Sequence, residues 1–257
     1  MTLSIINSNC GFVRVRRALV EGGAWKRLWD ADHGISAGTL VVLMLRANEP
    51  NASGYSSCPL RWLGAMAGLP QYALGKAQVN LAGLGLVKFA PHADLGTWSF
   101  RLHEDVGSAG DRDPAFYLPA WLVTHGVWAG FPPATKCLLI ALLSVAKVRM
   151  WYGEEEEVAA TDSELFAWLA ARKAIMERED HMLAARRVVQ TTLRELSCLS
   201  GLSPRSVSRA LATLNQTSIV NIRKHQREVS VHFPDYPWHP SGVVADEEWE
   251  YEPLDGR

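Results

Sequence analysis

Two arginines one helical turn apart are the side chains of this chain best suited to recognise another molecule. Arg205 and Arg209 stand in the stretch LSGLSPRSVSRALATL, Leu199 to Leu214. A guanidinium can donate two parallel hydrogen bonds to a guanine edge, and the hydroxyls of Ser206 and Ser208 can contact phosphate. Residues four apart share one face of a helix. These four side chains are therefore candidate contacts to double-stranded DNA.

The element that must position them is a helix beginning at Ser203 and Pro204. The serine hydroxyl can accept a hydrogen bond from a free backbone N–H of the first turn, and proline at the first helical position loses no hydrogen bond. Apolar residues then recur at i, i+3, i+4 and i+7, which predicts one buried face roughly opposite the arginines. These residues are Val207, Ala210, Leu211 and Leu214.

A shorter amphipathic helix is expected just upstream, over Thr191–Leu199. Its leucines, Leu193, Leu196 and Leu199, are expected to face inward. Gly201 falls between the two helices, where a tight turn needs a residue that tolerates positive φ. Two short helices joined by such a turn form a helix-turn-helix.

The residues that follow are typical of a strand, a basic turn and a second strand. Ile219, Val220 and Ile222 are β-formers, and Val229, Val231 and Phe233 alternate inward. The basic residues near the turn are expected to contact the DNA backbone or the adjacent minor groove. They are Arg223, Lys224 and Arg227.

A helix-turn-helix followed by a hairpin with a basic tip resembles the winged-helix regulators, whose recognition helix begins S-x-x-T/S-V-S-R. The resemblance covers about 45 residues, from Thr191 to Phe233. It implies a winged-helix fold, with the helix that carries Arg205 and Arg209 lying in the major groove.

The pattern occurs twice, because a shift of 133 residues places Gly68 on Gly201 without a gap. The first copy is a second candidate winged helix. Tyr72 and Lys76 occupy the positions of the two arginines, and they are candidate DNA contacts on weaker grounds. We expect the first copy either to bind DNA weakly or to mediate association.

An apolar helix precedes each copy, over Ala37–Ala47 and Ala134–Ala146, and the second copy has about 36 extra residues after it. The extra residues begin with the glutamate run Glu154–Glu157. A capping box at Thr161–Glu164 predicts a long helix that continues to about Val189. Two alternatives stay open: this helix packs on its own domain, or it bridges the domains or pairs with another chain.

The fold class predicted from these signals is α+β, mainly α, with two tandem winged-helix domains and a long helix inserted in the second. The predicted divisions are an N-terminal arm over 1–30, a first winged-helix domain over 31–106, a linker over 107–114, a second winged-helix domain over 115–234 with its helical insertion at about 154–190, and an acidic, disordered tail over 235–257.

Basic residues also occur near the N-terminus. Either this segment is an arm that touches DNA phosphates, or it is an amphipathic strand or helix that flanks the first domain. The residues concerned are Arg14, Arg16, Arg17, Lys26 and Arg27.

The net charge of −1 hides an uneven distribution. Thr191 to Phe233 contains six Lys/Arg and two Glu, whereas Pro234 to Arg257 contains one Arg and seven acids. A basic module followed by an acidic tail fits a nucleic-acid partner. Four dispersed cysteines without a CxxC pair, no signal peptide and no long apolar run favour a cytoplasmic protein without a membrane partner.

We expect no enzymatic activity, no metal and no cofactor. No Gly-rich phosphate loop follows an expected strand, and the eight histidines have no HxH or HExxH spacing.

The function predicted is sequence-specific binding of double-stranded DNA, as a transcriptional regulator of a plasmid, phage or integrative element. Two winged-helix domains in one chain also resemble plasmid replication initiators, which bind repeated origin sites. A third alternative is a winged-helix protein-interaction subunit of a DNA-organising complex. A homodimer through the inserted helix or the first domain is left open.

Overall fold

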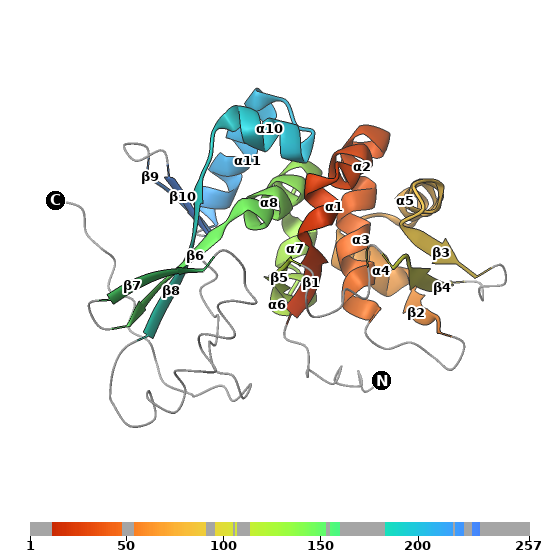
Figure 1. Cartoon of the computed structure of the whole chain (residues 1–257). Coiled ribbons are helices and arrows are strands. Elements are labelled where there is room, and N and C mark those ends of the chain that lie inside the picture. Colours follow the sequence, from red (N-terminus) through yellow and green to blue (C-terminus); the bar gives the residue numbers. More distant parts are fainter. Residues whose placement is uncertain are drawn as a thin grey trace, which may run out of the picture.

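The protein is α+β and mainly helical, and its described residues form three small antiparallel sheets. The computed structural model describes residues 12–47, 54–90, 96–104, 106, 114–152, 155–159, 183–217, 219–223 and 228–231. We call the elements up to residue 106 the first half and those from residue 114 the second half. The two halves lie beside each other in Figure 1.

The two halves share an order of elements: a strand, two short helices, a buried helix, then strands around two further helices. The first half consists of β1 (Phe12–Arg16), α1 (Arg17–Glu21), α2 (Ala24–Asp32), α3 (Ile35–Arg46), β2 (Ser56–Pro59), α4 (Leu60–Ala67), α5 (Gln71–Gly83), β3 (Val87–Phe89) and β4 (Thr97–Leu102). The second half contains β5 (Ala115–Pro119), α6 (Ala120–Thr124), α7 (Val127–Gly130), α8 (Pro133–Val145), β6 (Lys147–Tyr152), β7 (Glu155–Ala159), β8 (Leu183–Gln190), α10 (Leu193–Ser200), α11 (Pro204–Gln216), β9 (Val220–Arg223) and β10 (Glu228–Val231).

The repeat at a shift of 133 residues is present in the structure. Helices α4 and α5 coincide with α10 and α11 when their numbers are raised by 133. A second correspondence, at a shift of 103, extends the repeat to the N-terminal elements. It relates Gly23 to Gly126, both left-handed residues that precede a helix, and Trp25 to Trp128, both fully buried.

Strands β1 and β5 relate the halves by an approximate two-fold axis. They form an antiparallel pair in which Arg14 is opposite Tyr117. The same register places Val13 opposite Leu118 and Val15 opposite Phe116, so equivalent positions exchange places across the pair. All four of these apolar side chains are buried. Because each strand is the other's only partner among the described residues, the pair joins the two halves.

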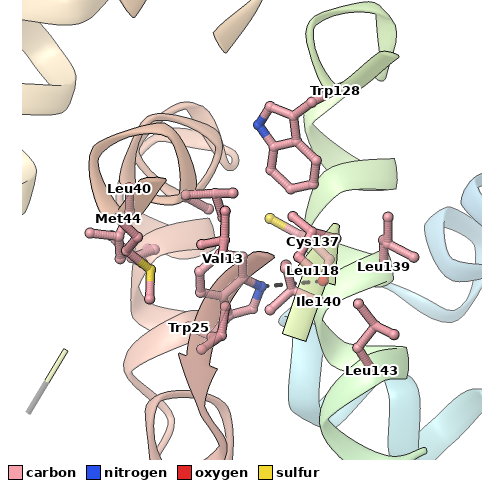
Figure 2. Close-up of a cluster of buried hydrophobic side chains, with 14 of the residues drawn as sticks. Val13, Trp25, Leu40, Met44, Leu118, Trp128, Cys137, Leu139, Ile140 and Leu143 are labelled. Carbon is pink, nitrogen blue, oxygen red and sulfur yellow. Dashed lines mark hydrogen bonds between the residues drawn. The ribbon is translucent and has the colours of Figure 1, made fainter. Parts of the chain in front are cut away.

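The core lies where α3 of the first half packs against α8 of the second (Figure 2). Both helices are apolar around most of their circumference, and a helix of that kind is stable only when covered on several sides. Leu40 and Leu43 of α3 and Ile140 and Leu143 of α8 are essentially inaccessible to solvent. The apolar helices expected at 37–47 and 134–146 are confirmed, with bounds one or two residues earlier.

Residues 12–30, expected as an arm or as flanking structure, form β1, α1 and most of α2. Their apolar residues, such as Trp25 and Leu28, are buried in the core. Two of the arginines bind backbone carbonyls inside the protein: Arg16 donates to Glu104 and Arg17 to Ala146. The strand-and-helix alternative therefore describes this segment.

The expectation of a long inserted helix is wrong at both ends of the insertion. Residues 155–159, which contain most of the glutamate run, form strand β7, and Leu183–Gln190 form strand β8. With β6, β9 and β10 they make a five-stranded sheet in the order β7-β6-β8-β10-β9. Pairing of β8 with strands on both sides overrides the helical signal, because it satisfies the backbone across the sheet and buries Val189. The capping box at 161–164 lies outside the described residues.

Candidate nucleic-acid interface

Helix α11 begins and packs as its sequence predicts. Ser203 is the N-cap residue, and its hydroxyl accepts a hydrogen bond from the backbone N–H of Ser206 at 3.2 Å. Pro204 occupies the first helical position. The expected apolar face is confirmed as buried, and it consists of Val207, Ala210, Leu211 and Leu214.

The opposite face of α11 is a solvent-exposed strip, which we call the α11 strip: Arg205, Ser208, Arg209 and Ala212. The guanidinium groups of both arginines have no hydrogen-bond or ion-pair partner within the part of the chain that the structure describes. The helix contains no acidic residue. Two unpaired guanidinium groups on one exposed face are available for a polyanion.

Ser206 differs from Ser208 in what its hydroxyl already contacts. The Ser206 hydroxyl lies 3.0 Å from that of Ser203 and is only partly exposed. Ser208 is exposed on the α11 strip. Of the two candidate phosphate contacts, Ser208 is therefore accessible to a phosphate, whereas Ser206 also takes part in the helix cap.

Helix α10 and its turn fix the start of α11. A capping box between Thr192 and Glu195 begins α10, and the hydrogen bonds from the two threonines lower the pKa of Glu195. Gly201 ends the helix at φ 76°, in the left-handed conformation expected for the turn. Leu196 is buried as expected, but the expectation for Leu193 is wrong: this residue is 45% exposed, because it is the first residue of the helix and lies beyond the core.

The two helices are held by elements from both halves. Helices α10 and α11 both pack against α8, and α10 also contacts α2 of the first half (Figure 1). A β-carbon placed on Gly201 would lie 3.0 Å from Lys26 Cγ and 3.0 Å from Trp29 Cδ1, both on α2. The turn before α11 therefore rests directly on the first half.

The expected hairpin after α11 is formed by β9 and β10, which pair in antiparallel register with Arg223 opposite Glu228. Arg223 is the last residue of β9. Lys224 and Arg227 lie outside the described residues. The structure thus brings the backbone of one of the three basic residues to the expected place.

Helix α5 presents a different surface at the equivalent positions. Tyr72, Gly75, Lys76 and Val79 make an exposed strip, the α5 strip, which matches the α11 strip at the shift of 133. Tyr72 is 84% exposed and Val79 is 71% exposed. With one cation and two large exposed apolar side chains, the α5 strip has fewer donors for a polyanion and more apolar surface for a partner.

A buried carboxylate fixes α5, and it was not predicted. Asp32, at the end of α2, accepts hydrogen bonds from the backbone N–H and the hydroxyl of Ser36 in the first turn of α3. It also accepts a hydrogen bond of 2.8 Å from Asn80 Nδ2 of α5. The only signal in the sequence was a carboxylate four residues before a serine, a common spacing.

A buried lysine fixes α4 in a related way. Lys136 of α8 is 2% exposed and donates a hydrogen bond of 2.6 Å to the carbonyl of Ala67, the last residue of α4. Its ammonium also lies 5.8 Å from the centre of the Trp128 ring. Burial lowers the pKa of Lys136 to about 8. A positive group at the C-terminal end of a helix is favoured by the helix dipole.

Within the described ranges, no group of three or more His, Cys, Asp or Glu side chains is arranged to hold a metal. Burial raises the pKa of the Cys58 thiol to about 12 and also raises that of Cys137, so neither thiol forms a reactive thiolate at neutral pH. None of the helices described has the length and apolarity to cross a bilayer.

Comparisons with protein-family models, curated proteins and solved structures found no match to this chain.

Proposed function

We propose that the protein binds double-stranded DNA in a sequence-specific manner, with α11 as the recognition helix of a winged-helix domain. The α11 strip is the observation that carries the proposal. It combines two exposed arginines, whose guanidinium groups have no partner among the described residues, with an exposed serine on a helix that is capped by Ser203 and buries its apolar face. Arginines on a firmly held helix suit bidentate contacts to guanine in the major groove.

The arrangement around α11 supports a winged helix in the second half. Helices α10 and α11 are joined by a left-handed glycine, and β9 and β10 follow as an antiparallel pair. The first half repeats this order with α4, Gly68, α5, β3 and β4. We interpret the chain as two winged-helix domains, of which the second is the principal DNA reader.

The biological role follows from resemblance. The sequence S-P-R-S-V-S-R at the start of α11 resembles winged-helix regulators, which favours a transcriptional regulator of a plasmid, phage or integrative element. A replication initiator that binds repeated origin sites is the alternative suggested by the repeated order of elements. The exposed apolar residues of the α5 strip favour a role for the first half in association, either with a second copy or with another protein.

The test is selection of bound sequences from a random duplex library by the purified full-length protein. We expect an enriched motif for the wild type and no enrichment for a variant with both Arg205→Ala and Arg209→Ala. The matched control is Arg61→Ala with Lys88→Ala, which removes two exposed cations from the first half. Each good bidentate arginine contact is worth about 1–3 kcal/mol of base discrimination.

The results separate the hypotheses. A wild-type protein that is folded and enriches no motif at low salt would refute sequence-specific binding and leave the protein-interaction alternative. An enriched motif that survives loss of both arginines would refute α11 as the reader. A palindrome beside the gene's own promoter would support a regulator, and evenly spaced repeats would support an initiator.

A further inference from the structure

Helix α2 belongs to the first half by sequence and packs against the helix-turn-helix of the second half. The methylene stem of Lys26 and the side chain of Trp29 pack against Gly201. If Gly201 had a β-carbon, it would lie 3.0 Å from Lys26 Cγ. Gly201 stands two residues before Ser203, the N-cap of α11. Lys26 is therefore anchored beside the end of α11 that begins the α11 strip.

The charge of Lys26 is not used by any contact among the described residues. The side chain is exposed, and it has no hydrogen-bond or ion-pair partner among the residues that the structure describes. Long lysine side chains bury their methylene stem against apolar surface and keep the ammonium in water. The Cγ of Lys26 is packed against the turn while the residue as a whole is exposed, as in this arrangement.

The equivalent contact in the first half carries no charge. A β-carbon on Gly68 would lie 2.1 Å from the carbonyl oxygen of Ala129 in α7. Ala129 corresponds to Lys26 at the shift of 103, and Gly130 corresponds to Arg27, which is also exposed. In each half the turn glycine lies against the corresponding short helix, but Gly201 meets the side chains of Lys26 and Trp29, whereas Gly68 meets the backbone of Ala129.

We propose that Lys26 binds a backbone phosphate of the DNA site that α11 reads, so that the positive surface of the second helix-turn-helix is completed by the first half. The proposal rests on the DNA-binding function proposed above. Phosphate contacts position a protein on the duplex without reading sequence. Lys26 therefore sets affinity and register, whereas Arg205 and Arg209 select bases.

The experiment measures binding of the full-length protein to its selected duplex over a series of salt concentrations. Loss of one phosphate contact reduces the magnitude of the slope of log K against log salt by about 1. We expect that reduction for Lys26→Gln, with the selected motif unchanged. Lys88→Gln is the matched control, because it removes one exposed lysine from β3, on the sheet of the first half.

A second measurement locates the contact. Single phosphates of the duplex are replaced by neutral methylphosphonates. We expect one replacement, at the edge of the segment protected by α11, to weaken the wild type and leave Lys26→Gln unaffected. Thermal unfolding of the variant should match the wild type, because the replaced group is exposed.

The outcomes distinguish this proposal from the proposed function. If the wild type selects a motif and Lys26→Gln keeps the full slope, the assignment of Lys26 is overturned and the function stands. If Lys26→Gln and Lys88→Gln reduce the slope of log K against log salt equally, the effect reflects net charge and not a contact at Lys26. That result would also overturn the assignment. Absence of specific binding by the wild type would overturn both.

Discussion

Trp25 and Trp128 make the same hydrogen bond in opposite directions between the two halves of the chain. Nε1 of Trp25 donates to the carbonyl of Cys137 in α8, and Nε1 of Trp128 donates to the carbonyl of Gly38 in α3, each at 3.2 Å. Figure 2 shows both indoles in the core between these helices. The halves are thus held by paired contacts, and we expect them to unfold as one unit.

Replacement of either indole should therefore destabilise the whole chain. Trp25→Phe and Trp128→Phe each remove a buried hydrogen bond and some volume, so we expect each to lower the free energy of unfolding by about 1–3 kcal/mol. The measurement is urea unfolding followed by far-ultraviolet circular dichroism. The control is Trp62→Phe at a half-buried position. Two separate transitions, each sensitive to one tryptophan, would contradict a single unit.

Three glycines with positive φ should differ in how much stability the protein loses when each is replaced by alanine. All three positions compared here have positive φ, which costs a non-glycine residue about 1–2 kcal/mol. Gly85→Ala should cost only that, since nothing lies within 4 Å of the added carbon. Gly201→Ala should lower the free energy of unfolding further, because the added carbon meets Lys26 and Trp29. Gly68→Ala should lower it most, because its added carbon meets a backbone oxygen. Equal losses in thermal stability would show that the halves are not in contact at these turns.

Removal of the buried carboxylate should loosen the attachment of α5. Asp32→Ala leaves the first turn of α3 and the Asn80 amide without their acceptor. A buried donor that loses its charged acceptor lowers the free energy of unfolding by about 1–3 kcal/mol. Asp30→Ala, at an exposed position on the same helix, should change stability by no more than about 0.5 kcal/mol. Chemical denaturation of both variants tests this, and equal effects would refute a structural role for Asp32.

The buried lysine should make stability depend on pH. Because the folded pKa of Lys136 is about 8 and its ordinary value is 10.5, the unfolded chain binds more protons at Lys136 between these values. Its contribution to the free energy of unfolding therefore rises with pH, by about 1.4 kcal/mol between roughly pH 7 and 9. The two buried thiols have the opposite effect above about pH 9. Because their folded pKa values are raised, the folded state keeps protons that the unfolded chain releases, and their contribution to the free energy of unfolding falls with pH.

Lys136→Met isolates that group. Between roughly pH 7 and 9, the free energy of unfolding of the wild type should rise by about 1.4 kcal/mol relative to that of the variant. A constant difference would mean that Lys136 keeps an ordinary pKa in the folded protein.

The basic residues of the expected wing should govern the salt dependence of DNA binding. Neutralising Arg223, Lys224 and Arg227 together should reduce the slope of log K against log salt by up to about 3, because each phosphate contact contributes about 0.9. The motif selected from a random library should remain the same. An unchanged slope would mean that this hairpin does not touch phosphate.

Local signals were enough to predict α10, α11 and the buried face of α11. Ser203, Pro204 and Gly201 each act within a few residues of their own position, so the sequence shows their effect directly. The apolar repeat at i, i+3, i+4 and i+7 also predicted that Arg205 and Arg209 lie on the exposed face of α11. The shift of 133 then predicted α4 and α5.

Non-local pairing accounts for what the sequence did not reveal. Strand β1 pairs with β5, which begins 99 residues after it ends, and β8 lies between β6 and β10. Neither partner is visible in a local pattern, so the segment 183–190 was assigned by continuation of a helix. Lys26 was noticed as a basic residue, but its place beside Gly201 depends on the packing of α2 across the halves.

The pairing of β1 with β5 has a consequence for the order of events during synthesis. The ribosome completes β1 about 100 residues before it makes β5, the strand that pairs with it in the described part of the chain. At about 5–20 residues per second, the nascent chain carries an unsatisfied strand edge and an uncovered face of α3 for about 5–20 s. Translation speed through the segment between the halves therefore sets how long the nascent chain is exposed to aggregation and to chaperones.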